Sequence, residues 1–300
     1  MRILVTGKEG QVDTSLQMLG EELGLDIVRI GLPEIDLSEP QILEAVVREI
    51  HPDVIISSAA YTAVDKAESE PELAQKINGD TPGELARLAA VLNIPILHLS
   101  TDYVFAGDKA GIYDETDEPA PVCVYGKTKL SGENQIRAAT DNHVILRTAW
   151  VYSPFGNNFV KTMLRLGETR DELSVVSDQH GCPTYAPEIA RALLAIAQQV
   201  AIDPDPTIRG TFHLTGEGET DWAEFAAAIF QGAEKRGRKA VRIKPITTAE
   251  YPTPAKRPAN SRLNGQKLDD TFGLHLDPWR TSLDDCLDRL IGTKIKDNSL

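Results

Sequence analysis

Residues 1–13 read MRILVTGKEGQVD, in which an apolar run, Ile3 to Val5, leads directly into a loop that contains Gly7 and Gly10. Glycine permits a tight turn between a strand and a helix and lets the backbone approach a ligand closely. The free N–H groups at the start of the following helix would then face a pyrophosphate. The stretch therefore predicts a strand, a loop and a helix that together bind a dinucleotide, with a purely structural turn as the alternative.

Asp13 stands where such a loop usually carries its third glycine. That glycine lets the helix pack closely on the strand, and a carboxylate near the turn could repel phosphate. Aspartate is also favourable in the first turn of a helix, where its side chain can point to solvent. We expect Asp13 to turn away from the pyrophosphate.

Apolar runs recur along the first half of the chain, and amphipathic stretches such as Leu73 to Leu92 separate them. Runs that are apolar throughout indicate strands buried on both faces, as in a parallel sheet. The recurrence of strand and helix predicts an α/β fold with a doubly wound, Rossmann-type parallel sheet. The predicted strands are residues 3–5, 26–30, 54–56, 94–99 and 144–146.

The alternation becomes irregular after about residue 150, which predicts a smaller, discontinuous C-terminal lobe that binds substrate. We expect helices at 158–166 and 187–200, strands at 173–176 and 211–214, and a further helix capped by Asp221. The predicted dinucleotide-binding domain is residues 1–152, completed by about 172–210, and residues 153–171 and 211–300 mainly form the substrate lobe.

The composition is that of a globular protein of 300 residues, with 41% hydrophobic and 25% charged residues. A net charge of -14 argues against nucleic acid as a partner, because binding it needs cations that neutralise phosphates. The three cysteines, without CxxC spacing, indicate neither a disulfide framework nor a zinc site. We expect a cytoplasmic protein, because we find neither a signal peptide nor an apolar run of membrane length.

Tyr125 and Lys129 stand four residues apart, on one face of a predicted helix, and Thr101 lies where an apolar strand ends. A free tyrosine has a pKa of about 10, and a neighbouring cation such as Lys129 would favour its anionic form. Hydride addition to a ketone builds negative charge on oxygen, which a positioned acid and a hydrogen-bond donor stabilise. Such a site needs no metal. Taken singly, the Tyr/Lys pair would mark an exposed helix face.

The chain resembles the extended short-chain dehydrogenase/reductases almost from end to end. Besides the loop, the stretches that carry the resemblance are 59–68 (AAYTAVDKAE), 100–107 (STDYVFAG), 147–152 (RTAWVY) and 257–261 (RPANS). The resemblance implies hydride transfer from a nicotinamide cofactor to the 4-keto group of dTDP-4-dehydro-L-rhamnose, giving dTDP-L-rhamnose. Another 4-keto-6-deoxy sugar nucleotide stays open as the substrate.

The resemblance also implies roles for individual residues. Tyr125 would donate the proton, Thr101 would polarise the carbonyl, and Lys129 would hold cofactor ribose hydroxyls and tune Tyr125. The other residues that match cofactor positions are Gly7, Gly10, Gln11, Val12, Asp36, Leu37, Ala60, Tyr61, Thr62 and Leu99. The residues that match the substrate pocket are Thr101, Asp102, Tyr103, Trp150 and Arg257, the last as a diphosphate ligand.

Several alternatives stay open. Arg29 and the lack of a suitably placed acidic residue favour NADPH over NADH, because an arginine can meet the 2′-phosphate. Trp150 can instead be a core residue, and Arg257 a surface ion-pair partner. We expect His180 to be a loop histidine and Cys182, Trp222 and Trp279 to be packing residues.

A dehydratase and a non-catalytic binding subunit are the alternatives to a reductase. A dehydratase of this superfamily typically shows Thr-Asp-Glu after the strand, whereas Tyr103 replaces the glutamate here, which disfavours elimination. A non-catalytic binding subunit, like the regulatory β subunit of methionine adenosyltransferase, stays open because Asp13 departs from the loop pattern. The sequence also allows a homodimer.

Overall fold

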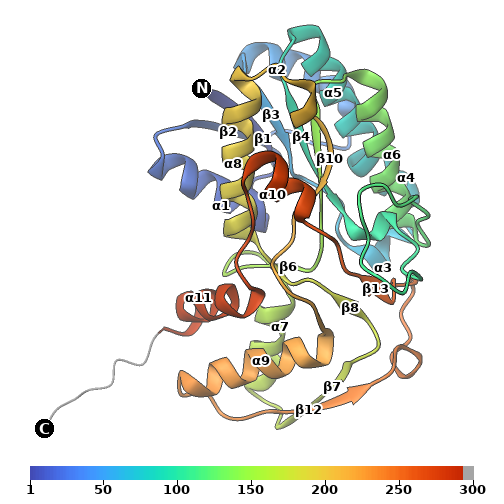
Figure 1. The fold of residues 1–300 in the computed structure, drawn as a ribbon, viewed down its shortest axis with the longest axis vertical. Helices are drawn as coiled ribbons and strands as arrows, with labels where there is room; N and C mark the ends of the chain where they lie inside the picture. The colour runs from blue at the N-terminus through green and yellow to red at the C-terminus, as the bar shows by residue number, and fades with distance from the viewer. Residues whose placement is uncertain (293–300) are drawn as a thin grey trace, which may run out of the picture.

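The computed structural model describes residues 1–292. A parallel sheet of six strands forms its centre, in the order β10-β5-β4-β3-β1-β2 (Figure 1). All five neighbouring pairs run parallel, so the prediction of an α/β fold with a Rossmann-type sheet is confirmed. The strands are β1 (Arg2–Thr6), β2 (Asp26–Ile30), β3 (Val54–Ser57), β4 (Ile96–Thr101), β5 (His143–Thr148) and β10 (Gly210–His213).

Helices cover both faces of this sheet, because each strand presents apolar side chains alternately to the two sides. Ile3 and Val5 of β1 pack with Leu16 in one buried cluster, to which the helix α8 also contributes. Leu4 points to the opposite face and packs in a second cluster with Leu85. The covering helices are α1 (Gln11–Glu22) and α8 (Ala186–Ile202) on one face, and α2 (Leu43–Ile50), α5 (Thr81–Leu92) and α6 (Val124–Ala139) on the other.

The helical stretch expected from Leu73 to Leu92 is confirmed, but it contains a turn of π-helix. α4 (Pro71–Gln75) ends in a π-helical turn at Lys76–Asp80, after which α5 begins. The turn directs Asn78 inward, where its Oδ1 accepts from the Tyr61 amide at 2.7 Å and its Nδ2 donates to Thr128 Oγ1 at 3.1 Å. These tertiary contacts explain why helical spacing alone did not reveal the π-helical turn.

A smaller lobe lies below the sheet and has its own core, in which Tyr152, Phe225 and Trp279 are buried together (Figure 1). Asp221 caps its α9 as predicted, since the carboxylate accepts from the Glu224 amide at 2.8 Å. The main elements of this lobe are α7 (Phe159–Gly167), α9 (Trp222–Lys235), α11 (Trp279–Ile291), β7 (Glu172–Val176) and β12 (Arg242–Ile246). The shorter elements of the chain as a whole, in either lobe, are α3 (Val64–Ala67), α10 (Gln266–Phe272), β6 (Val151–Tyr152), β8 (His180–Gly181), β9 (Thr184–Tyr185), β11 (Thr220–Asp221) and β13 (Asn260–Ser261).

Two strands lie in a different lobe from the one that the predicted boundaries give them. β7 falls in 172–210, yet it pairs with β12 in the smaller lobe. β10 extends beyond residue 210, yet it pairs with β5 in the central sheet. Strand pairing between distant segments decides both placements, which a reading along the chain does not reveal.

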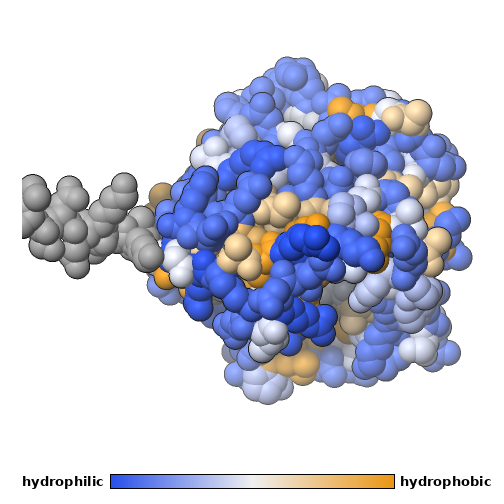
Figure 2. All heavy atoms as spheres, turned by 90° about the horizontal axis from the view of Figure 1, so that it is seen from below, coloured by the Kyte–Doolittle hydropathy of each residue, from blue (hydrophilic) through white to orange (hydrophobic). Residues whose placement is uncertain are grey.

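The surface seen from below, where the smaller lobe lies, is mostly hydrophilic, with apolar side chains gathered near the middle of that face (Figure 2). In residues 1–292 no helix is both long and apolar enough to cross a membrane.

Candidate active site

A cleft of about 690 Å³ lies at the carboxyl ends of the central strands and is closed on one side by the smaller lobe. Most of the predicted site residues line it, although they come from distant parts of the chain. These are Gly7, Gly10, Gln11, Val12, Ala60, Thr62, Leu99, Thr101, Asp102, Tyr103, Tyr125, Lys129 and Trp150.

The glycine loop forms one end of the cleft. Gly7 has φ +109°, a conformation that a residue with a Cβ rarely adopts, and its amide donates to Ile30 O at 2.7 Å. Thr6 Oγ1 accepts from the amides of Ser58 and Ala59, both at 3.0 Å, which fixes the loop to the end of β3. The amides of Gln11 and Val12, in the first turn of α1, have no acceptor within the helix and can therefore donate to a ligand.

Asp13 does not point to solvent, in contrast to that part of our expectation. Only 5% of the residue is exposed, and its Oδ2 accepts from the Gly10 amide at 3.1 Å. A Cβ on Gly10 would lie 2.3 Å from Asp13 Oδ1, so the carboxylate fills the space that the glycines leave open. The local capping bond at the start of α1 explains this inward position.

Tyr125 and Thr101 both line the cleft, and the Thr101 hydroxyl donates to Asp102 Oδ1 at 3.0 Å. The ring of Tyr103 packs edge-on against that of Tyr125, with 5.5 Å between centroids. α6 approaches closely because Gly126 has no side chain, since a Cβ there would lie 2.1 Å from Tyr103 O. Burial raises the pKa of Tyr125 above its ordinary value, so its hydroxyl is protonated at neutral pH.

Lys129 lies one helical turn after Tyr125, but its ammonium group turns toward β4. Nζ donates to Leu99 O at 2.8 Å and lies 3.1 Å from His98 Nε2. Burial lowers the pKa of Lys129 to about 8, against an opposing effect of Glu133. The expected lowering of the Tyr125 pKa by Lys129 does not occur in this arrangement, because burial of the phenol outweighs other effects.

A buried ion pair lies behind the end of β4. Glu133 accepts from Arg147 at 2.9 and 2.7 Å and from Ser100 Oγ at 2.6 Å. Burial alone would raise the pKa of Glu133, but the bonds and charge of Arg147, the bond from Ser100 and the charge of Arg137 together hold the pKa below its ordinary value. The pair joins α6 to β5 and so supports the strand end that carries Thr101.

Trp150 forms the wall of the cleft next to the smaller lobe. It has φ +49°, which is strained for a bulky residue, and its ring stacks on that of Trp222 with 3.5 Å between centroids. Trp222 comes from the first turn of α9 and lines the cleft as well. Two stacked aromatic rings thus form this wall of the cleft.

The residues fit a nicotinamide dinucleotide in most respects. The cradle of Gly7 and Gly10, the free amides of α1 and the remaining N–H of the Lys129 ammonium offer donors along one path. Asp13 is the departure, because it takes up the Gly10 amide and brings negative charge into the cradle. Within residues 1–292 no cluster of three or more His, Cys, Asp or Glu side chains could hold a metal ion.

Comparison with known proteins agrees with this geometry. A model of the family described as RmlD substrate binding domain matches residues 1–291. The chain belongs to this family.

Relatives at high identity carry one name. The dTDP-4-dehydrorhamnose reductase of Sinorhizobium fredii is 48% identical, over 94% of this chain and 95% of the relative. A crystal structure of a dTDP-4-dehydrorhamnose reductase from Clostridium acetobutylicum superposes with a TM-score of 0.90 at 40% identity, covering 97% of this chain and 99% of the other. The reductase of Bacillus anthracis, solved in complex with NADP, gives a TM-score of 0.88 at 35% identity, covering 95% and 98%.

Four predicted residues of this RmlD family member lie outside the lining of the cleft. Asp36 accepts from the Ser38 amide at 2.9 Å, and Leu37 is buried. The Tyr61 hydroxyl donates to Glu70 at 2.5 Å. Arg257 makes a bidentate pair with Asp65, at 2.7 and 3.0 Å, which is the ion-pair alternative stated for it.

The sequence did not predict the role of some residues that shape the cleft. Trp222 was predicted to be core, but it lines the cleft, since the packing of α9 turns the start of the helix toward Trp150. Asn78 supports the Tyr61 backbone from below, and its only sequence signal was a polar residue within an apolar helical pattern. Cys182 is a buried packing residue, and burial raises the pKa of its thiol to about 11.

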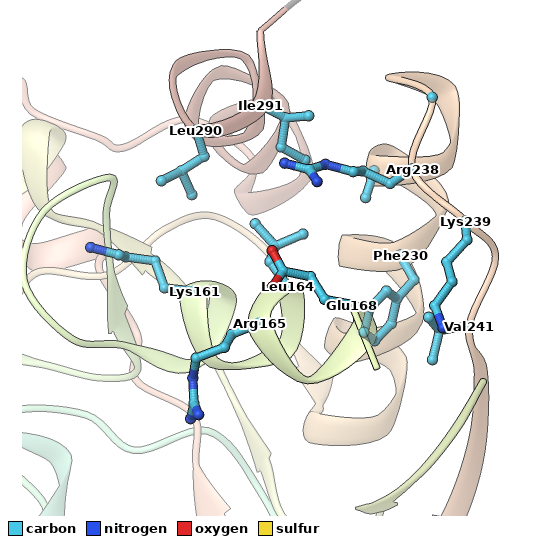
Figure 3. A pocket seen from close by; sticks show the side chains of 13 residues that line it. Lys161, Leu164, Arg165, Glu168, Phe230, Arg238, Lys239, Val241, Leu290 and Ile291 are labelled. Carbon is cyan, nitrogen blue, oxygen red and sulfur yellow. The ribbon is translucent and has the colours of Figure 1, made fainter. Parts of the chain in front are cut away.

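A second hollow, of about 450 Å³, lies within the smaller lobe between α7, α9 and α11. Figure 3 shows Leu164, Phe230 and Ile291 around it, with Arg238 reaching over it and Lys161 pointing aside. It shares no lining residue with the cleft that holds Tyr125. The second hollow is therefore separate from the candidate active site.

Proposed function

We propose that the protein is an NADPH-dependent reductase that converts dTDP-4-dehydro-L-rhamnose to dTDP-L-rhamnose. The observation that carries this proposal is that Thr101 and Tyr125 line one cleft together with the glycine loop and the stacked tryptophans. The names of the relatives agree, and one of them is solved with NADP. NADH stays open as a second cofactor.

Reduction of a ketone needs a hydride, which a reduced nicotinamide supplies when bound. The protein must then stabilise charge on the carbonyl oxygen and deliver one proton to it. Thr101 donates a hydrogen bond to that oxygen, and Tyr125 transfers its hydroxyl proton to it. The raised pKa of Tyr125 ensures that the proton is present before the reaction.

Lys129 holds cofactor ribose hydroxyls through the N–H that is not bound to Leu99 or His98. Its ammonium also compensates the negative charge that forms on Tyr125 after proton transfer, since opposite charge favours the ionised phenol. Gln11 and Val12 contribute amides to the diphosphate. Asp36 and Leu37 lie after β2 and stay assigned to the adenine side.

The sugar nucleotide occupies the other half of the cleft. Trp150 packs against it, and Asp102 and Tyr103 border the sugar from the end of β4. Arg257 binds the diphosphate by exchanging the Asp65 carboxylate for phosphate oxygens, which accept the same bidentate geometry.

The test is purified protein with NADPH and dTDP-4-dehydro-L-rhamnose, followed by cofactor absorbance and product analysis. We expect oxidation of NADPH with formation of dTDP-L-rhamnose. Tyr125→Phe should lower kcat by about 10²- to 10⁴-fold with cofactor binding intact, because it removes only the proton donor. Cofactor binding without turnover of this or any related 4-keto sugar nucleotide would favour a regulatory subunit instead.

The remaining expectations concern the setting of the reaction. We propose a cytoplasmic location, supported by three free, buried cysteines. The net charge of -14 supports the absence of nucleic acid as a partner. A homodimer is the assembly to test, by light scattering of the purified protein.

A further inference from the structure

Asp13 places a carboxylate inside the glycine loop, at a position where the usual loop pattern has a glycine. Its carboxylate lies inside the turn, with Cγ 3.1 Å from the position that a Cβ on Gly7 would take. Oδ2 accepts from the Gly10 amide, so the carboxylate replaces an external anion at one donor of the loop. A phosphate that approaches this loop meets a buried negative charge.

The surroundings of this carboxyl give it little compensation. Of the charged groups in residues 1–292, Arg29 on β2 attracts its negative charge and Glu9 in the loop repels it. Arg29 is also engaged, because its Nη1 donates to Lys8 O at 2.8 Å. α8, which packs against α1, contributes apolar side chains such as Ile189 and Leu193.

We propose that cofactor binding by this chain takes up a proton at Asp13, so that the affinity for NADPH falls as the pH rises. The inference rests on the proposed use of NADPH. A neutral carboxyl keeps the bond from Gly10 and has an O–H to offer to a phosphate oxygen, whereas an ionised one repels it. The proton comes from solvent and returns there when the cofactor leaves.

The titration of the carboxyl in the free protein agrees with this proposal. Burial raises the pKa of Asp13 above its ordinary value, against the opposing effects of its own amide, the Gly10 amide and Arg29. An added dianionic diphosphate would raise the pKa further, since like charge disfavours the ionised form. Binding and protonation therefore favour each other.

The experiment is calorimetric titration of NADPH into the unmodified protein, from neutral to mildly alkaline pH, in two buffers of different ionisation enthalpy. We expect proton uptake and a Kd that rises by up to about tenfold per pH unit. Asp13→Asn, which keeps the size of the side chain, should abolish this uptake and bind at least about tenfold more tightly at the alkaline end. The 2′-phosphate of NADPH also takes up a proton, with a pKa of about 6. Its contribution is the same for every variant, so the difference between variants reports Asp13.

Glu22→Gln is the matched control, because Glu22 is an exposed carboxylate at the other end of α1, outside the cleft. It should behave as the unmodified protein does. Equal Kd and equal proton uptake for Asp13→Asn and the unmodified protein would overturn the proposal. Tighter binding by Asp13→Gly alone would overturn it too, because bulk rather than charge would then be responsible. If no variant binds NADPH at any pH, the proposed function itself fails.

Discussion

Nζ of Lys129 lies 3.1 Å from Nε2 of His98, and both side chains are buried. An ammonium group only donates, so Nε2 must accept, and the proton of the neutral ring is on Nδ1. Nδ1 then donates to Ser57 Oγ at 3.1 Å. Burial and the charge of Lys129 keep the pKa of His98 well below its ordinary value, in agreement with a neutral ring. His98 is therefore a positioning residue for Lys129.

His98→Leu removes the acceptor and leaves a buried N–H of Lys129 without a partner. We expect the free energy of unfolding to fall by about 1–3 kcal/mol and the pKa of Lys129 to fall below about 8. The alkaline limb of the kcat/KM profile should move to lower pH accordingly. His98→Gln, which offers an amide oxygen near the position of Nε2, should restore most of the profile. An unchanged profile in His98→Leu would show that His98 only fills space.

Glu133→Gln tests the buried ion pair behind β4. The change leaves Arg147 buried without its counter-charge, so we expect a loss of about 3–5 kcal/mol in the free energy of unfolding, measured with urea. Glu84→Gln removes the carboxylate of the more exposed Arg87–Glu84 pair and should cost less than about 1 kcal/mol. Equal losses in the two variants would mean that the buried pair contributes no more to the free energy of unfolding than an exposed ion pair does.

Trp222→Leu removes one ring of the stack against Trp150. We expect KM for the sugar nucleotide to rise by up to about tenfold, since an aromatic pair contributes about 0.5–1.5 kcal/mol, while the Kd of NADPH stays unchanged. Phe159→Leu is the control, because Phe159 contacts Trp222 at 4.6 Å between centroids without lining the cleft. An equal rise of KM in the control would assign the effect to the core of the smaller lobe.

The sequence predicted the central sheet because its strands are apolar on both faces. Ile3, Leu4 and Val5 of β1, for example, are all buried, although successive side chains point to opposite faces of the sheet. Thr101 was predicted to be a site residue because it stands at the end of an apolar strand. Tyr125 was predicted because it stands four residues before Lys129 on a helix, and both line the same cleft.

Features that depend on contacts between distant residues could not be predicted in this way. An aspartate in the first turn of a helix can point to solvent, but a capping bond from the Gly10 amide holds Asp13 inside the turn. Trp222 was predicted to be a core residue. The sequence pattern shows which face of a helix is apolar, but it does not show which part of the protein that face contacts. No role was predicted for His98, because the role of a histidine inside an apolar strand depends on its contact with Lys129, which the sequence does not show.

Asp102 is the clearest case in which the cleft costs stability. Burial raises its pKa from 3.8 to about 6, against hydrogen bonds from Ser261 and Thr101. The folded state thus binds the proton more tightly than the unfolded chain does. The stabilising effect of the protonated form is complete below the unfolded pKa of 3.8 and is lost as the pH rises through about 6.

Asp102→Asn should therefore stabilise the protein at neutral pH, because the amide needs no proton to be neutral. We expect a gain of about 1–3 kcal/mol in the free energy of unfolding, measured with urea, and no gain below about pH 4. Activity should fall at the same time, since Asp102 borders the predicted sugar site. Asp114→Asn, at a carboxylate outside the cleft, is the control and should show no such pH-dependent gain. A gain that persists unchanged in acid would contradict the assignment, because packing rather than ionisation would then explain it.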